Sequence, residues 1–176
     1  MKKLLLLTAV AGLFAFSSVN AQVIKSPKLS VGADFGFPIG DASEGTDFAF
    51  GGSLQYQHPV AENLLLTGSA GYLNFKGKDF DFGGVTVKGG NVGVIPVKAG
   101  ARYYFGENFF VNGELGAGFS TEKGGSTAFI YAPGAGVEFE VSDKSSVELG
   151  ARYEGHSVSG GTASFIGLRA AFNFGI

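Results

Sequence analysis

A short segment around residue 156 contains the residue types that a hydrolase uses. His156 lies two positions after Glu154, and the hydroxyl residues Ser157 and Ser159 follow it. A serine nucleophile needs an imidazole within hydrogen-bond reach and a carboxylate that orients that imidazole. In an extended chain, Ser157 would point to the face opposite Glu154 and His156. The spacing therefore argues against a catalytic role, and we expect no enzyme activity.

Charged side chains recur at alternate positions in several segments whose intervening positions are apolar. Lys28 and Glu140 follow this pattern at two segment ends. The nine residues assigned to the candidate charge network are Asp34, Lys98, Arg102, Glu114, Glu138, Glu148, Arg152, Glu154 and Arg169. Acidic and basic groups nearly balance, so they can pair if one enclosed space holds them.

Two roles are open for this network. It could be static and satisfy charges that do not reach bulk water, or it could gate a narrow pore by exchanging partners among Arg102, Glu114, Glu138, Arg152 and Arg169. The static role is favoured, because side chains normally fill the interior of a narrow barrel.

The segment between residues 76 and 91 contains two short alternating arms around Gly83-Gly84. This pattern predicts a β-hairpin that extends the neighbouring strands. Its apolar positions are Phe80, Phe82, Val85 and Val87. A projecting hairpin exposes backbone groups and apolar side chains, which can capture a partner by strand addition. A surface loop that binds nothing is equally compatible with the sequence.

The composition of the 176 residues excludes several other functions. With no Cys, the chain has no disulfide, thiol nucleophile or thiolate metal site, and two His leave little for a histidine metal centre. A net charge of −2 without a basic run argues against nucleic acid as a partner. We therefore expect no metal and no cofactor.

The first 21 residues have the layout of a secretory signal peptide. A cationic start at Lys2 and Lys3 precedes an apolar run from Leu4 to Phe16 and small residues up to Ala21. The apolar run is shorter than the roughly 20 residues that span a membrane. We expect cleavage after residue 21 and a single domain at residues 22–176.

Eight segments of that domain alternate apolar and polar residues with a period of two, which predicts strands. They cover residues 28–37, 48–57, 64–72, 95–105, 109–119, 131–141, 147–154 and 166–176. Charge is absent from one face of every segment, and that face carries the Phe, Leu and Val, whereas the charged face is otherwise mostly Gly, Ser, Ala and Asn. Apolar residues facing outward around a polar lumen are typical of a transmembrane barrel.

Chain length favours eight strands. A transmembrane strand takes roughly 9–11 residues, and twelve strands would leave only about three residues for each connection. Short connections alternate with longer ones at 38–47, 76–91 and 121–126, which we place outside the cell. Pro96 and Pro133 lie within predicted strands, where we expect a bulge or weak pairing near a rim. A soluble ligand-binding barrel is the competing architecture.

The eight alternating segments and the closing sequence from Phe165 to Phe174 resemble the small outer-membrane β-barrel family that includes outer membrane proteins X and A. The segment from Ile95 to Phe105 is similar to a recurrent strand of that family. The chain departs from the family in ending on Ile176, where Phe or Trp is usual, although Phe172 and Phe174 share its face. The His-x-Ser-Asn-Ala pattern of the lipid A deacylase barrels is absent.

This resemblance implies an eight-stranded antiparallel up-and-down barrel in the outer membrane of a Gram-negative bacterium, with periplasmic termini. We expect a monomer in outer-membrane lipid that meets an extracellular protein or surface ligand through its loops, with a filled lumen. A small gated channel is the alternative, and a lipid-modifying hydrolase that uses His156 and a nearby Ser is a distant third.

Overall fold

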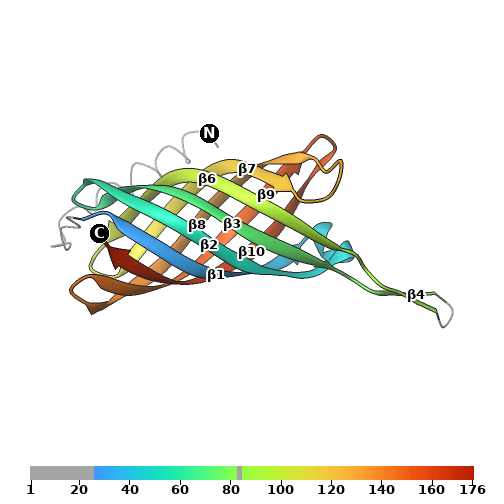
Figure 1. The fold of residues 1–176 in the computed structure, drawn as a ribbon, viewed down its shortest axis with the longest axis horizontal. Helices are drawn as coiled ribbons and strands as arrows, with labels where there is room; N and C mark the ends of the chain where they lie inside the picture. Colours follow the sequence, from blue (N-terminus) through green and yellow to red (C-terminus); the bar gives the residue numbers. More distant parts are fainter. Residues whose placement is uncertain (1–25, 83–84) are drawn as a thin grey trace, which may run out of the picture.

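The computed structural model describes residues 26–82 and 85–176, and eight strands close into one antiparallel barrel (Figure 1). They are β1 (Lys28–Ile39), β2 (Thr46–Ala61), β3 (Leu64–Gly77), β6 (Asn91–Phe105), β7 (Phe109–Ser120), β8 (Thr127–Ser142), β9 (Ser145–Val158) and β10 (Gly161–Gly175). The barrel closes where β1 pairs with β10, from Lys28 opposite Gly175 to Ile39 opposite Ser164. The predicted fold class is confirmed. The expected signal peptide at residues 1–21 lies outside the described residues.

The strands are longer than the hydrophobic pattern predicts. The third predicted segment ends at residue 72, but β3 continues to Gly77 through pairs such as Phe75 with Val92. The sixth begins at residue 131, but β8 begins at Thr127, opposite Phe119. Backbone pairing with the neighbouring strand extends these strands beyond the part of the sequence in which apolar residues alternate clearly.

The connections differ at the two ends of the barrel. Two- and three-residue turns at 62–63, 106–108 and 143–144 lie at the end that also holds Ile176, here called the turn end. The opposite loop end carries the connections at 40–45, 78–90, 121–126 and 159–160 (Figure 1). The first contains the short helix α2 (Ala42–Gly45), and the second contains β4 (Phe80–Phe82) and β5 (Val85–Val87). In the part of the chain that the structure describes, no helix has the length and apolar character needed to cross a membrane.

The distribution of polar and apolar side chains is inverted relative to a soluble protein. Large apolar residues line the outside, including Leu54 at 54% exposure and Leu115 at 58%. Charged residues of the network point into the lumen, where Arg102 and Glu148 are each only 2% exposed. Apolar residues on the outside and polar ones in the lumen are what a barrel in lipid requires.

The two mid-strand prolines interrupt the hydrogen-bonded ladders without a bulge. Pairing of β3 with β6 stops at Ala70–Val97 and resumes at Leu73–Val94, so Pro96 falls in the gap. Pairing of β8 with β9 stops at Tyr131–Gly155 and resumes at Gly134–Arg152, which leaves out Pro133. The register is the same on both sides of each gap. Proline has no N–H to donate, which accounts for the weak pairing. The expected bulge is absent at both positions, and both gaps lie within the barrel wall.

Glycine at position 100 allows two neighbouring strands to approach closely. A Cβ at Gly100 would lie 2.0 Å from the carbonyl oxygen of Gly113, a backbone atom that cannot rotate away. A Cβ at Gly113 would meet nothing within 4 Å. We therefore expect Gly100→Ala to destabilise the barrel by about 1–3 kcal/mol, the usual cost of overpacking, and Gly113→Ala to have little effect. Urea unfolding in lipid vesicles, followed by the gel mobility of unheated samples, measures both, and equal stability of the two variants would contradict the close approach.

Candidate functional site

Arg102 is buried in the lumen, and both of its Nη atoms donate hydrogen bonds to buried side chains, whereas its Nε has no hydrogen-bond partner among the described residues. Its Nη1 and Nη2 donate to the two carboxylate oxygens of Glu148 at 2.6 and 3.0 Å. Nη2 also donates to Gln55 at 3.1 Å, and the guanidinium lies 3.9 Å from the ring centroid of Phe110. A bidentate ion pair supported by a cation–π contact fixes this side chain in one position.

Glu148 joins this arginine to others in what we call the turn-end ion-pair group. Arg169 Nη1 donates to Glu148 at 3.0 Å, and Arg102 lies 3.8 Å from Glu138. Glu138 accepts hydrogen bonds from Lys28 at 2.6 Å and from the hydroxyls of Tyr104 and Ser146. The members of the group are Lys28, Arg102, Glu138, Glu148 and Arg169.

A second set, the loop-end ion-pair group, contains the other lumenal charges. Arg152 donates to Asp34 at 2.8 Å and to Glu154 at 2.6 Å. Lys98 lies 2.9 Å from Glu154 and 3.4 Å from Glu114. The members of this group are Asp34, Lys98, Glu114, Arg152 and Glu154.

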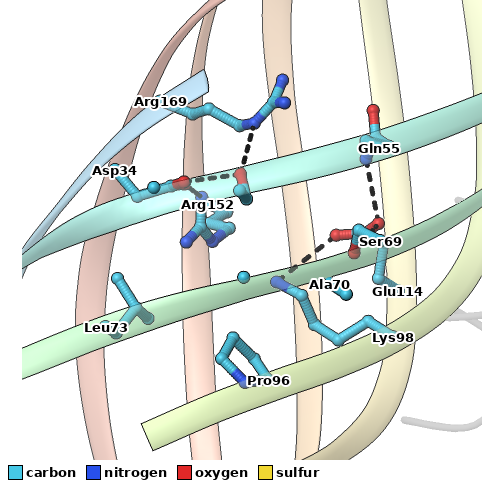
Figure 2. Close-up of a pocket in the computed structure, with 13 residues that line it drawn as sticks. Asp34, Gln55, Ser69, Ala70, Leu73, Pro96, Lys98, Glu114, Arg152 and Arg169 are labelled. Carbon is cyan, nitrogen blue, oxygen red and sulfur yellow. Dashed lines mark hydrogen bonds and ion pairs between the residues drawn. The ribbon is translucent and has the colours of Figure 1, made fainter. Parts of the chain in front are cut away.

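Neutral side chains connect the two groups (Figure 2). Ser53 donates to Asp34 at 2.6 Å and accepts from Arg169 at 3.2 Å. Gln55 accepts from Arg102 and donates to Glu114 at 3.0 Å. Between them is a cavity of about 30 Å³, close to the share of liquid volume of one water molecule. Ser53 and Gln55 were not among the predicted site residues, although both alternate in phase with the charged positions.

Clusters of aliphatic and aromatic side chains lie near both ends of the network. Leu65, Tyr104 and Phe110 form a buried cluster near the turn end. Toward the loop end, the rings of Phe75 and Phe165 contact each other and His156 edge-on, with centroids 5.4–5.8 Å apart. Most other uncharged lumenal residues are small, as the sequence predicts, and examples are Ser30, Ala49 and Ala128. Phe75 and Phe165 were not predicted as lumenal, because they lie in the parts of β3 and β10 that extend beyond the predicted segments.

The structure brings all nine residues of the predicted charge network into the lumen, where each makes at least one ion pair. Lys28 joins them, whereas Glu140 lies exposed near the end of β8. His156 bonds to Glu154 through Nε2 at 2.9 Å, but Ser157 donates nothing to it and instead accepts a hydrogen bond from Thr162. This arrangement does not form a nucleophile–base pair.

The predicted hairpin forms a two-stranded sheet of its own beyond the barrel (Figure 1). β4 pairs with β5 from Phe80 opposite Val87 to Phe82 opposite Val85. Phe80 is 47% exposed and Val87 54%, whereas the side chains of Phe82 and Val85 lie outside what the structure describes. On the other face of the hairpin, Thr86 donates to Asp81 at 2.7 Å.

Backbone and side-chain bonds hold the base of the hairpin to the barrel. The Gly77 N–H donates to the Gly90 carbonyl at 2.9 Å, which continues the β3–β6 ladder. The Lys78 N–H donates to Gly45 at 3.0 Å, and the Gly89 N–H donates to the Asp79 carboxylate at 2.9 Å. These bonds position the hairpin relative to the loop end.

Comparison with known proteins supports the architecture. No protein-family model matches the sequence, and no curated protein matches it either. Among solved structures, Ail, the attachment invasion locus protein of Yersinia pestis, matches 86% of this chain and 100% of its own, with 20% identity and a TM-score of 0.55. Neisserial surface protein A matches over 85% of this chain and 97% of its own, with 14% identity and a TM-score of 0.66. A structure of Ail in complex with the heparin analogue sucrose octasulfate matches 85% of this chain and 98% of its own, with 20% identity and a TM-score of 0.53.

These similarities establish the fold. The chain has the closed eight-stranded barrel of small outer-membrane proteins, so the resemblance inferred from the sequence is confirmed at that level. At such low identities, the neighbours' ligands and activities do not follow for this chain.

Proposed function

We propose that this protein is a monomeric integral outer-membrane barrel whose loop end binds an extracellular protein, with the β4–β5 hairpin as its main contact. The observation that carries this proposal is that the hairpin projects beyond the barrel and exposes Phe80 and Val87 (Figure 1). Apolar side chains that are exposed outside the lipid-facing wall mark a candidate site for contact with another protein.

The inverted barrel supports the membrane location. Its outward residues are apolar from β1 to β10, and closure leaves no unpaired strand edge in the wall. The proposed signal peptide at residues 1–21 would bring the chain to the periplasm, and the turn end would then face that compartment.

The hairpin suits recognition by strand addition. With only two strands, it leaves the outer edges of β4 and β5 without a ladder partner within its own sheet. An extended segment of a partner can pair with such an edge while its side chains cover Phe80 or Val87. One solved structure of Ail, which shares this fold, is a complex with the heparin analogue sucrose octasulfate. Because the exposed pair in this chain is apolar, we propose a protein ligand instead of a sulfated sugar.

A double substitution tests the hairpin. We expect Phe80→Ser with Val87→Ser to reduce adherence at least about tenfold, since the loss of two apolar contacts in an interface core commonly costs more than about 1.4 kcal/mol. Adherence is measured with bacteria that display the full chain on cultured epithelial cells. Thr86→Val is the matched control, because it changes the opposite face of the same hairpin. The barrel itself should keep its stability in all variants.

Unchanged adherence of the double variant, or equal loss in the Thr86 control, would contradict the role of the hairpin. Salt dependence separates apolar contact from polyanion binding. Adherence through Phe80 and Val87 should persist at 0.5 M salt, whereas binding of a sulfated polysaccharide to lysines should weaken strongly there.

The channel and hydrolase alternatives find less support. The two ion-pair groups and the apolar clusters lie within the lumen, so opening a continuous pore would require buried contacts such as Arg102–Glu148 to break. A hydrolase would need a hydroxyl bonded to His156, and that imidazole bonds to Glu154 inside the barrel. We therefore propose neither activity for this chain.

A further inference from the structure

A second candidate site lies in the mouth of the barrel at the loop end. A cavity of about 540 Å³ opens there, within the range of small-molecule sites. Its polar lining comes from Asp41, Ser120, Ser126, His156 and Thr162. We call it the mouth cavity. His156 forms part of its base and separates it from Glu154 and the ion pairs beyond.

The described residues that line the mouth cavity carry formal charge of one sign only. Asp41 contributes an exposed carboxylate, and none of the described residues that line the cavity is Lys or Arg. The cavity therefore offers one formal negative charge and several hydroxyl oxygens to a ligand.

The buried network beyond His156 contains charges of both signs. The loop-end ion-pair group has three carboxylates but only Lys98 and Arg152, a surplus of one negative charge. The turn-end group has three basic residues but only Glu138 and Glu148, a surplus of one positive charge. The group with the negative surplus contacts His156, at the base of the mouth cavity. The carboxylate that contacts His156, Glu154, is itself paired with Lys98 and Arg152, so the charge available to a ligand in the mouth cavity is that of Asp41.

Apolar residues complete the lining. Val94 and Val158 face the same space as the hydroxyls. A ligand that fits therefore has an apolar body and a cationic donor group that reaches the Asp41 carboxylate.

We propose that the mouth cavity binds small organic ammonium ions, with Asp41 as the counter-ion and the hydroxyls of Ser120, Ser126 and Thr162 as hydrogen-bond acceptors. This site is independent of the hairpin, since Phe80 and Val87 do not line it. If the mouth cavity binds no ammonium ion, the proposed role of the hairpin is unaffected. If the hairpin has no role in adherence, the proposed mouth-cavity site is likewise unaffected.

Three probes of equal chain length test the charge preference. We expect 1,4-diaminobutane to shift the amide resonances of Asp41, Gly160 and Thr162 in the full chain held in a non-ionic maltoside micelle. We expect 1,4-butanediol to bind at least about tenfold more weakly and succinate not to bind. A non-ionic micelle is required because phosphate headgroups would themselves bind the diamine. Equal shifts from the diol and the diamine would overturn the proposal, as would shifts confined to other loops.

Two variants test the location. Asp41→Asn should weaken diamine binding at least about tenfold, because it removes the charge-assisted contact. Asp47→Asn is the matched control, since it makes the same charge change at an exposed position outside the lining and should leave binding unchanged. Ala163→Phe should abolish binding by filling the mouth cavity, at a position where Ala163 is exposed. Full diamine affinity in both Asp41→Asn and Ala163→Phe would refute this site.

Discussion

Replacing Glu148 by alanine should lower the free energy of unfolding by about 3–5 kcal/mol, the range found when one partner of a buried ion pair is removed. Glu148 is 2% exposed and accepts from both Arg102 and Arg169. Its loss would leave two buried guanidinium groups without their principal carboxylate. Urea unfolding in lipid vesicles, read from gel mobility without heating, gives the difference directly.

The control for this prediction is Glu62→Ala, which removes the same carboxylate from an exposed position in the 62–63 turn. We expect that variant to change stability by less than about 0.5 kcal/mol. A loss below about 1 kcal/mol in Glu148→Ala would mean that water reaches the network. Planar-bilayer recordings on the unchanged protein address the same question, and steady large conductance would contradict a filled lumen.

An arginine in place of Leu115 should cost about 2–4 kcal/mol in lipid vesicles, as found for basic residues at the bilayer midplane of outer-membrane barrels. Leu115 is 58% exposed in the middle of β7, opposite Ala99 and Tyr131. On the surface of a soluble protein, the same substitution would change stability by no more than about 0.5 kcal/mol. The measured value therefore distinguishes a lipid-facing barrel from the soluble alternative.

Val141→Arg is the positional control for Leu115→Arg. Val141 is 56% exposed, but it lies one residue before the end of β8, beside the 143–144 turn. Arginine there reaches the interface, so the expected cost is about 0–1 kcal/mol. Equal costs at the two positions would contradict a lipid band centred on Leu115.

The sequence was sufficient to predict the fold because lipid imposes a strict period of two on the strands. Each change of phase would place a charge such as Arg102 or Glu148 in hydrocarbon, so the inward face could be read directly. The same reasoning located the hairpin, since Gly83-Gly84 separates two alternating arms.

The sequence did not determine which lumenal residues meet. Arg102 and Glu148 are 46 positions apart, and Arg152 and Asp34 are 118 apart. Their pairing depends on barrel closure and on the stagger between strands, neither of which the pattern of a single strand contains. The two ion-pair groups and the mouth cavity both form only when the barrel closes, so the sequence pattern could not predict them either. The predicted strands were also too short at the loop end of β3 and β8, because backbone pairing continues beyond the residues that alternate clearly between apolar and polar.

The two ladder gaps are local weak points in the wall. Pro96 weakens the β3–β6 boundary and Pro133 weakens the β8–β9 boundary. The lumenal cavity of about 30 Å³ lies beside the gap in the β3–β6 ladder, next to Pro96 (Figure 2). During amide exchange, we expect the backbone amides beside these two gaps to exchange before those of the uninterrupted ladders.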